Sequence, residues 1–388
     1  MHYQPADRLQ KFNTGIFAAM DEKKDALIAS GREVINLSIG TPDFSPPQHI
    51  MDTIAEAMRD PYNYRYSLTD TPEVLQTLVN YYKTRYGAVI SADEITGVHG
   101  TQEGMGHLGM AMVNPGDIVL LPDPGYPIYE ACALLADAEI CYYPLVRENS
   151  FLPNMNDIPE DVLKRTKFIV LSYPSNPVGM SAPKKMYLEM IALAKKYGFF
   201  IINDNAYSDI IFDGKEGFSF LALPGAKEVG VEFFSLSKSF NMTGLRASYL
   251  IGNKSIVDGL KLLRSQYDFG IPYPIQKAVV AALTGPMDDV YAQCDEYQRR
   301  RDALCDGLRK AGWDVPKSDG TMFVWLPVPE GYTSVSFIEK LMDKTGIIGT
   351  PGTAFGPHGE GYVRFALVRP ADEMARIAEM IGDMLAAE

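Results

Sequence analysis

The chain has 388 residues, enough for two or three domains of ~150 residues, with 46% apolar residues, 22% charged residues and a net charge of −13. This composition excludes wholesale disorder, and no run reaches the ~18 apolar residues of a transmembrane helix. The acidic balance disfavours nucleic acid as a partner, and the N-terminal sequence MHYQPADRLQKFN lacks the apolar segment of a signal peptide. We therefore expect a cytoplasmic protein that binds neither nucleic acid nor a membrane.

The first 47 residues are expected to form an N-terminal arm that packs on the end of the chain. Their pattern favours a helix from about Phe17 to Ser30 and a proline-rich turn from Thr41 to Pro47.

Residues 48–287 alternate between short apolar runs and helical patterns, as at Pro183–Tyr197, where Gly198 is a typical helix stop. Each run has four residues between Gly, Pro, Asp or Asn, as in a strand buried on both faces. The runs are Ile118–Leu121, Phe168–Leu171, Phe199–Ile202, Val231–Phe234 and Ser248–Ile251. This alternation predicts a large α/β domain with a mostly parallel sheet between helices.

Residues 288–388 have a different pattern. A long helix is expected from Asp288 to Ala311, a strand around Met322–Trp325 and a last helix from about Pro370 to Ala387. We expect a second, smaller α/β domain here.

The four cysteines and five histidines are scattered along the chain. They form no CxxC or HxxxH pair, the spacings typical of reactive dithiols and zinc ligands. We expect reduced thiols and no protein-bound metal ion.

Polar residues follow three of the apolar runs of the large domain. Ligands of open α/β sheets bind just beyond the C-terminal ends of the strands, so these residues should meet at one edge. They are Asn176 after the second run, Asp204 and Tyr207 after the third, and Ser235, Ser237, Lys238 and Arg246 after the fourth.

These residue types suit one kind of chemistry. A partly desolvated lysine can form an imine with an aldehyde, and a buried Asp can keep a pyridine nitrogen protonated, which makes the ring an electron sink. Tyr and Asn can bind a phenolic oxygen, while Ser and Arg can hold a phosphate. Each residue alone has a plainer explanation, such as a solvated lysine or a helix N-cap, and only the combination favours this one.

The segment Ser235–Arg246 (SLSKSFNMTGLR) resembles the lysine motif of class I/II aminotransferases, which are fold-type I pyridoxal-phosphate enzymes. The resemblance extends over nearly the whole chain through further motifs in the same order: Ile39–Phe44, Gly100–Gln102, Pro124–Pro127, Tyr173–Pro177, Asp204–Tyr207, Pro274–Gln276 and Gly361–Phe365. It implies a large domain with a mostly parallel seven-stranded sheet, a smaller α/β domain and the cofactor pyridoxal 5′-phosphate.

The resemblance also implies the residues that hold the cofactor. Lys238 would be the Schiff-base lysine and proton shuttle, Asp204 would pair with the pyridine nitrogen, and Tyr126 would stack on the ring. The remaining contacts fall into two groups: Asn176 and Tyr207 for the phenolic oxygen, and Thr101, Gln102, Ser235, Ser237 and Arg246 for the phosphate, with Thr101 and Gln102 at a helix N-terminus.

Substrate and partner residues follow from the same comparison. Arg364 resembles the arginine that forks onto the substrate α-carboxylate, with Asn176 nearby. Gly40 would lie in a segment that closes over the substrate, unless it only serves a turn. Tyr66 resembles a tyrosine that reaches the phosphate in the other subunit, so the resemblance implies a homodimer with shared active sites. Tyr62 and Tyr64 compete for that role.

The expected function is transfer of an amino group from an L-amino acid to a 2-oxo acid such as 2-oxoglutarate. A carbon–sulfur β-lyase or decarboxylase on the same fold is the alternative, and a metabolite-sensing transcription factor would need a basic N-terminal module that the sequence lacks. The segment after Lys238 resembles the LL-diaminopimelate aminotransferase-like branch. LL-diaminopimelate, aspartate and aromatic amino acids all remain possible substrates.

Overall fold

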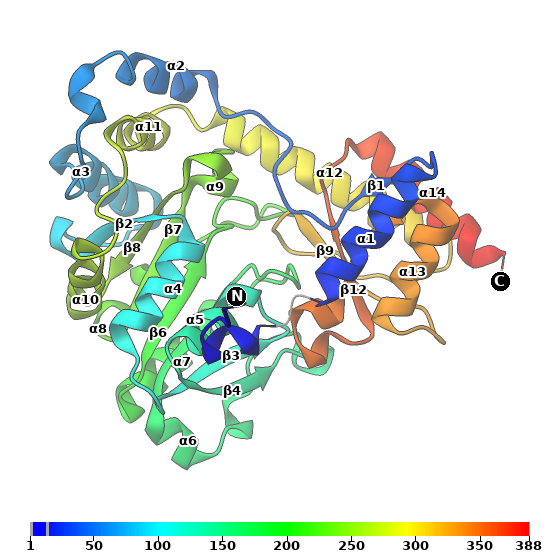
Figure 1. Ribbon diagram of the computed structural model, residues 1–388, viewed down its shortest axis with the longest axis horizontal. Helices are drawn as coiled ribbons and strands as arrows, with labels where there is room; N and C mark the ends of the chain where they lie inside the picture. Colours follow the sequence, from blue (N-terminus) through cyan, green and yellow to red (C-terminus); the bar gives the residue numbers. More distant parts are fainter. Residues whose placement is uncertain (1–2, 13–14, 388) are drawn as a thin grey trace.

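The computed structural model describes residues 3–12 and 15–387. In this part of the chain, a seven-stranded sheet has the strand order β2–β8–β7–β6–β5–β3–β4 (Figure 1). Neighbouring strands run parallel except β8, which is antiparallel to both β2 and β7. The strands are β2 (Ile95–His99), β3 (Ile118–Asp123), β4 (Glu139–Pro144), β5 (Thr166–Leu171), β6 (Phe200–Asn205), β7 (Gly230–Ser235) and β8 (Ala247–Gly252). The prediction of a mostly parallel seven-stranded sheet is confirmed.

The predicted apolar runs are the cores of β3, β5, β6, β7 and β8. Strands β6 and β7 are buried along their whole length, because helices cover both faces of the sheet. One face is covered by α4 (Thr101–Met112), α5 (Pro127–Leu135) and α10 (Lys254–Ser265). The other is covered by α2 (Gln48–Ala57), α3 (Pro72–Tyr81), α7 (Lys184–Tyr197) and α11 (Tyr273–Thr284). Three short helices, α6 (Glu160–Arg165), α8 (Ala226–Val229) and α9 (Leu236–Ser239), lie in the connections.

The predicted helix at 183–197 is confirmed in detail. Helix α7 begins after Pro183, whose lack of an N–H costs nothing at a helix start. It ends at Tyr197, where Gly198 takes the left-handed conformation with φ 84°.

A second group of elements is built from both ends of the chain. Strands β9 (Phe323–Pro327), β11 (Thr350–Pro351) and β12 (Tyr362–Ala366) form an antiparallel sheet in the order β11–β12–β9. It packs with α13 (Ser334–Thr345) and α14 (Ala371–Ala386), around a core separate from the cores of the large sheet. The N-terminal strand β1 (Ile35–Asn36) runs parallel to β10 (Ile347–Ile348).

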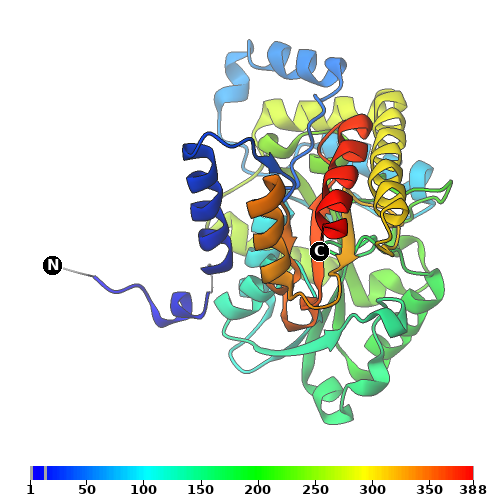
Figure 2. The same ribbon diagram turned by 90° about the vertical axis from the view of Figure 1, so that its right-hand side faces the viewer.

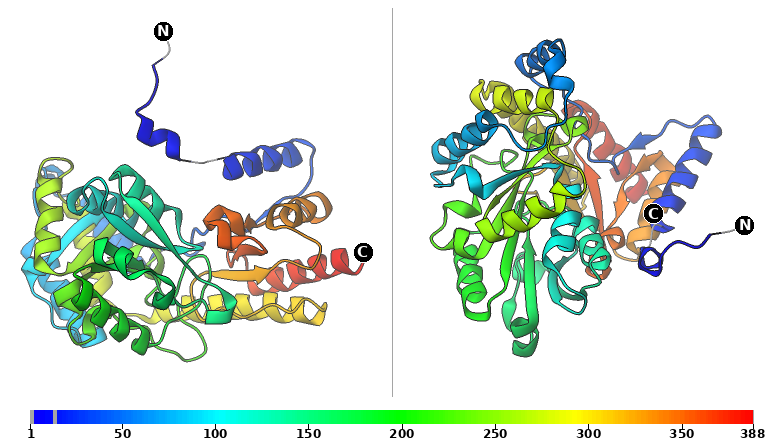
Figure 3. Two further views of the ribbon diagram at one scale, coloured as in Figure 1. Left: turned by 90° about the horizontal axis from the view of Figure 1, so that it is seen from below. Right: turned by 60° about the vertical axis from the view of Figure 1, so that its left-hand side comes forward.

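Helix α1 (Gly15–Ala29) lies beside α13, where Lys23 Nζ is 3.1 Å from Asp343 Oδ1 (Figures 2 and 3). Helix α12 (Asp288–Lys310) runs from the large sheet along the smaller group of elements (Figure 1). None of the helices in the described residues is long and apolar enough to cross a membrane.

The strand directions bring the polar segments of the large sheet together. Strands β5, β6 and β7 are neighbours and parallel, so the residues that follow them meet at one edge. Because β8 runs in the opposite direction, the segment before it reaches the same edge, and so does the end of β2. This edge faces the smaller group of elements.

Candidate active site

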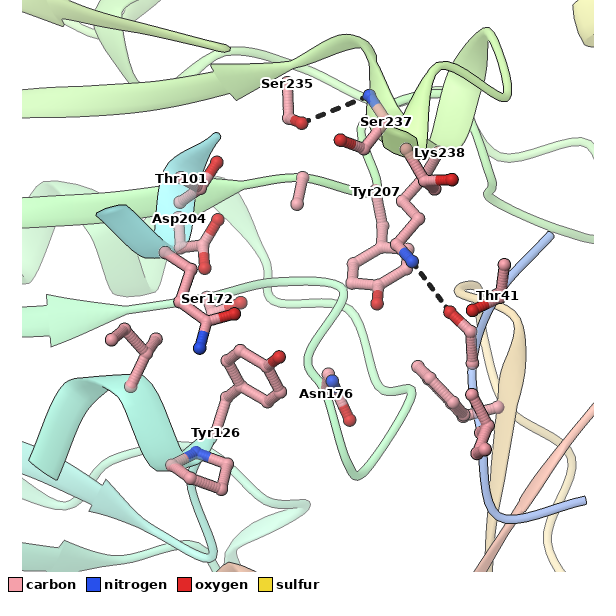
Figure 4. Close-up of a pocket in the computed structure, with 18 of the residues that line it drawn as sticks. Thr41, Thr101, Tyr126, Ser172, Asn176, Asp204, Tyr207, Ser235, Ser237 and Lys238 are labelled. Atoms are coloured by element: carbon pink, nitrogen blue, oxygen red, sulfur yellow. Dashed lines mark hydrogen bonds between the residues drawn. The ribbon is translucent and has the colours of Figure 1, made fainter. Parts of the chain in front are cut away.

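A cavity of about 520 Å³ opens at this edge of the sheet (Figure 4). Its lining includes every cofactor and substrate residue predicted from the sequence except Tyr66. These are Gly40, Thr101, Gln102, Tyr126, Asn176, Asp204, Tyr207, Ser235, Ser237, Lys238, Arg246 and Arg364. They come from segments between positions 40 and 364 of the chain.

Lys238 projects into this cavity from α9, the short helix that follows β7 directly. Its Nζ donates a hydrogen bond to the Gly40 carbonyl oxygen at 2.7 Å (Figure 4). Burial, together with the positive charges of Arg364 and Arg246, lowers the pKa of the amine to about 8. The amine can therefore lose its proton close to neutral pH and act as a nucleophile or base.

Asp204 lies at the end of β6 and is buried. The Tyr129 hydroxyl donates to Asp204 Oδ2 at 2.8 Å, while Asp204 Oδ1 is buried and has no hydrogen-bond partner in the described residues. Burial raises the pKa of this carboxyl to about 6. An unpaired buried carboxylate oxygen is costly, so this atom suits a ligand that carries a proton or a positive charge.

One corner of the cavity gathers groups that suit an anion. Helix α4 begins at Thr101, so its free backbone N–H groups and positive dipole end point there. Ser235 Oγ accepts bonds from Ser237 N (3.2 Å) and Ser248 Oγ (3.0 Å). Gly100 leaves the room for the Arg246 guanidinium, because a Cβ there would lie 2.0 Å from Arg246 Nη2. Together these groups form a corner with the chemistry to bind a phosphate.

Tyr126, Tyr207 and Asn176 line the space between this corner and Arg364. Asn176 Oδ1 accepts a hydrogen bond from Arg364 Nη1 at 2.9 Å. Only the Nδ2 donors of Asn176 therefore remain for a ligand oxygen. Tyr207 is buried and packs edge-on against Phe323, with ring centroids 6.2 Å apart.

Arg364, on strand β12, is buried and lines the cavity. Its Nη2 donates to the Ser38 carbonyl oxygen at 2.7 Å and to Thr350 Oγ1 at 3.4 Å. The guanidinium carbon lies 4.1 Å from the ring centroid of Phe323 and 4.5 Å from that of Phe355. Burial lowers the pKa of the guanidinium to about 10. Arg364 Nε is buried without a hydrogen-bond partner in the described chain. The group is held rigidly and has capacity left to bind an anion.

Gly40 lines the cavity, in the segment that the resemblance expects to close over the substrate. Its φ lies outside the left-handed range, so it is not required by a turn. A Cβ at this position would lie 2.1 Å from Phe323 Cζ. The glycine is needed because the backbone packs directly on the ring that covers Arg364.

Several residues of the site were missed by the sequence analysis. Tyr129 binds Asp204, and Phe323 and Phe355 enclose Arg364. The two phenylalanines had no signal of their own, because an apolar residue in a strand or loop is usually core. The Ser38 carbonyl was missed because backbone groups leave no trace in the sequence.

Tyr66 lies outside the cavity of its own chain. Its side chain is 81% exposed and its ring packs against Phe269, with centroids 5.8 Å apart. The competing Tyr62 and Tyr64 are also exposed.

A second cluster of ionisable groups lies on α4, outside the cavity. Ligand atoms of Glu103, His107 and Asp268 are within 4.8 Å of one another. Asp268 is already held by Arg264 through two bonds of 3.0 and 3.2 Å, and Glu103 contacts His107 Nδ1 and accepts a bond from His99 N at 2.8 Å. These internal pairs account for the charges, so we assign no metal ion to the cluster.

Comparisons with known proteins agree with this geometry. The family model "Aminotransferase class I and II" matches residues 32–381. The chain is 42% identical to an LL-diaminopimelate aminotransferase of Dehalococcoides mccartyi, over 95% of this chain and 96% of the relative. It is 41% identical to an LL-diaminopimelate aminotransferase of Halothermothrix orenii, over 97% of each chain.

A solved structure of a probable N-succinyldiaminopimelate aminotransferase from Thermus thermophilus superposes with a TM-score of 0.91 and 35% identity. The superposition covers 95% of this chain and 100% of the Thermus thermophilus chain.

Proposed function

The chain belongs to the class I and II aminotransferases, which use pyridoxal 5′-phosphate, and from this premise we propose that it transfers the amino group of LL-diaminopimelate to 2-oxoglutarate. The observation that carries the chemistry is the enclosure of the Lys238 amine, the Asp204 carboxylate and the Arg364 guanidinium in one cavity. The choice of LL-diaminopimelate rests on the names of relatives 37–42% identical to this chain. These names do not favour a carbon–sulfur β-lyase or a decarboxylase.

The residues of the cavity fit the cofactor. The free Asp204 Oδ1 suits a protonated pyridine nitrogen, and the corner formed by α4, Ser235 and Arg246 suits its phosphate. Tyr126 would cover the ring, and Asn176 Nδ2 and the Tyr207 hydroxyl would bind its phenolic oxygen. When bound, the cofactor supplies an electron sink for the negative charge left on the substrate α-carbon.

Each remaining task belongs to a residue of the chain. Arg364 would bind the α-carboxylate and so orient the Cα–H bond of the substrate. Lys238 Nζ, neutral once it has lost its proton, would remove the Cα proton as a general base. Asp204 would keep a proton on the ring nitrogen through a charged hydrogen bond. Phe323 and Phe355 would exclude water from Arg364 and strengthen its hold on the carboxylate.

The substrate assignment can be tested with a panel of amino donors. LL-diaminopimelate, aspartate, alanine and an aromatic amino acid should be compared by kcat/KM with 2-oxoglutarate as the acceptor. We expect LL-diaminopimelate to exceed the others by at least roughly 100-fold, a ratio that differences in side-chain contacts can supply. A higher kcat/KM for aspartate or for the aromatic donor would overturn the substrate and leave the aminotransferase activity intact.

The proposed enzyme is a homodimer with shared active sites. Exposed apolar side chains gather on the segments 62–68 and 267–269, as expected of an interface: Tyr62, Tyr64, Tyr66, Leu68, Tyr267 and Phe269. Rings from the two segments are in contact, as in Tyr66–Phe269. Tyr66 would reach the phosphate bound by the partner.

Subunit mixing tests the shared site. Lys238→Ala and Tyr66→Ala homodimers should each be inactive, and a mixture that exchanges subunits should regain one intact site per heterodimer. No recovery after proven exchange would mean that each site is made by one chain. Repeating the experiment with Tyr62→Ala and Tyr64→Ala shows which tyrosine acts.

Two further proposals concern the organisation of the chain. Residues 1–47 would form the N-terminal arm and part of the small domain, 48–287 the large cofactor-binding domain and 288–388 the small domain. The cytoplasmic location expected from the sequence stays a prediction.

A further inference from the structure

Arg300, on the long helix α12, has almost all of its N–H donors engaged in hydrogen bonds although it does not line the cavity. Its side chain is only 5% exposed. Nη1 and Nη2 form a fork onto Asp43 Oδ1 (2.7 Å) and Oδ2 (2.9 Å), Nη1 also donates to the Leu367 carbonyl oxygen (2.9 Å), and Nε donates to Glu296 Oε1 (3.1 Å). A guanidinium has five N–H groups, and these bonds use four of them.

Two of these partners lead directly to the proposed carboxylate site. Asp43 belongs to the segment Ser38–Phe44, called here the strap, whose Ser38 and Gly40 carbonyls meet Arg364 and Lys238. Leu367 follows the strand β12 that carries Arg364. Arg300 thus joins the end of the strap to the end of that strand.

The strap is docked on α12 by packing as well as by charge. Phe44 packs edge-on against Tyr297, with ring centroids 5.3 Å apart, and the Arg300 guanidinium lies 4.7 Å above the Phe44 ring. At the other end of the strap, Leu37 O accepts from Ala366 N at 2.8 Å. The strap is therefore held at both ends, and the part over the cavity lies between the two anchors.

We propose that Arg300 is a positioning residue for substrate binding. It fixes the strap and β12 relative to each other, and so sets the place of the Ser38 and Gly40 carbonyls against Arg364 and Lys238. This inference rests on the proposed role of Arg364 in holding the α-carboxylate. Arg300 does not line the cavity, so it acts only through the strap and through Leu367.

Arg301, the next residue, provides a matched control. It is also buried and forks onto an aspartate, with Nη1 and Nη2 each 2.7 Å from an oxygen of Asp213, and it donates to the Ser318 carbonyl oxygen at 2.8 Å. No hydrogen bond or ion pair joins Arg301 to the strap in the described residues. Loss of either fork should cost similar stability, and only loss of the Arg300 fork should disturb the carboxylate site.

The experiment compares Arg300→Lys with Arg301→Lys in the cofactor-loaded enzyme. A lysine keeps the charge and cannot form the fork. We expect Arg300→Lys to raise KM for the amino donor roughly 10- to 100-fold, because misplacement of a binding group by about 1 Å costs up to about that factor. The kcat should change by less than about threefold, and the cofactor absorbance should stay that of wild type. Arg301→Lys should leave KM unchanged at a similar fall in Tm.

Two readouts do not depend on turnover. The affinity for 2-methylglutamate, which has the carboxylate but no α-proton, should fall by the same factor as KM rises. The amides of the strap should exchange hydrogen faster in Arg300→Lys than in Arg301→Lys. Asp43→Asn breaks the same fork from its more exposed side, and the double variant Arg300→Lys/Asp43→Asn should be no worse than Arg300→Lys, because both changes remove one interaction.

Three results would overturn the proposal: an unchanged KM in both Arg300→Lys and Asp43→Asn, an equal rise in Arg301→Lys, or additive effects in the double variant. If Arg300→Lys does not fold, Asp43→Asn and its hydrogen exchange decide the question. If instead Arg364 does not bind the α-carboxylate at all, a different result is expected: Arg364→Lys would keep the wild-type preference for carboxylate substrates.

Discussion

The two halves of the cavity differ in how their polar groups are paired. The half proposed for the cofactor, called here the cofactor half, contains Asp204 and Lys238. Asp204 Oδ1 has no hydrogen-bond partner in the described chain, and Lys238 Nζ donates to the Gly40 carbonyl oxygen. In the half proposed for the substrate, called here the substrate half, Arg364 already donates to Asn176 Oδ1 and to the Ser38 carbonyl, and the rings of Phe323 and Phe355 lie against it. The first half lacks the charge that a ligand would bring. The charged group of the second is already held by bonds within the chain, and among the described residues only its Nε–H and one Nη1 N–H lack an acceptor.

This difference predicts different energetics. A ligand in the cofactor half gains bonds to groups that are costly to leave unpaired. A carboxylate on Arg364 would bind a guanidinium that chain acceptors already hold in place, and could take the Nε–H and the second Nη1 N–H, which have no partner among the described residues. We therefore expect substitutions in the cofactor half to change turnover, and substitutions in the substrate half to change affinity and specificity.

Lys238→Ala should show the largest effect. Removal of the amine removes the proposed nucleophile and general base together, so kcat should fall by about 10⁴-fold. The phosphate corner is untouched, so pyridoxal phosphate should still bind. The measurement is single-turnover absorbance with a saturating amino donor, together with borohydride reduction and peptide mapping of the wild type. A label on any residue other than Lys238, or turnover within tenfold of wild type, would contradict the assignment.

Asp204→Asn should lower kcat by roughly 10²- to 10³-fold, the usual cost of removing one group that stabilises transition-state charge. The amide oxygen can still accept from the Tyr129 hydroxyl, so Tm should change little. Tyr129→Phe is the matched control, because it removes that bond but keeps the carboxylate. If Asp204→Asn retains near wild-type turnover, another group keeps the ring nitrogen protonated.

Arg364→Ala tests the substrate half. Loss of one side of a desolvated bidentate pair costs about 2–5 kcal/mol, so kcat/KM should fall roughly 30- to several-thousand-fold. Arg364→Lys should also be strongly impaired, because an ammonium cannot reproduce the fork. The cofactor spectrum should be unchanged in both variants.

The sharpest test of Arg364 compares kcat/KM for an amino acid with kcat/KM for the matching amine, which lacks the carboxylate. Wild type should prefer the amino acid strongly, and Arg364→Ala should show little preference. A variant that keeps the wild-type preference would mean that the carboxylate binds elsewhere.

The same two halves also differ in how far the sequence predicted them. Asn176, Asp204 and Lys238 could be predicted because each follows a recognisable apolar run, and the ends of neighbouring parallel strands meet at one edge. The fold-type I sheet could be predicted for the same reason. The rings of Phe323 and Phe355 could not, because apolar residues have no pattern that separates a site from a core. The contact of Arg364 with Ser38 joins segments 326 residues apart, which depends on tertiary packing alone.

The buried amine of Lys238 should make the stability of the cofactor-free protein depend on pH. Its pKa is lowered to about 8 by burial, from an ordinary value of 10.5. Between these values the unfolded state binds more protons than the folded state, so stability contributed by this site rises with pH. Below about pH 8 the folded protein retains the buried charge, which lowers its free energy of unfolding by about 3 kcal/mol.

Denaturant unfolding of the cofactor-free wild type and of Lys238→Met, from pH 7 to pH 11, measures this effect. The stability difference between the two proteins should change by about 3 kcal/mol in favour of wild type as the pH rises, mostly between pH 8 and 10.5. A pH-independent difference would place the amine in a solvated environment.

Gly40→Ala should have the smallest effect and sharpen the contrast between the halves. The new Cβ would lie 2.1 Å from Phe323 Cζ and 2.5 Å from Cε1, closer than any real contact. Phe323 is buried and its ring centroid lies 4.1 Å from the Arg364 guanidinium, so a shift of the ring must disturb the proposed carboxylate site. Overpacking of this kind costs about 1–3 kcal/mol.

If this cost falls on substrate binding, KM should rise roughly tenfold with kcat nearly unchanged, since about 1.4 kcal/mol corresponds to a factor of ten. Gly106→Ala on α4 is the control, because a Cβ there meets nothing within 4 Å. Phe323→Leu added to Gly40→Ala should relieve the clash but also remove one ring from Arg364, so it should restore Tm more than KM. Equal restoration of both would mean that Phe323 only fills space, and that the enclosure of Arg364 does not contribute to carboxylate binding.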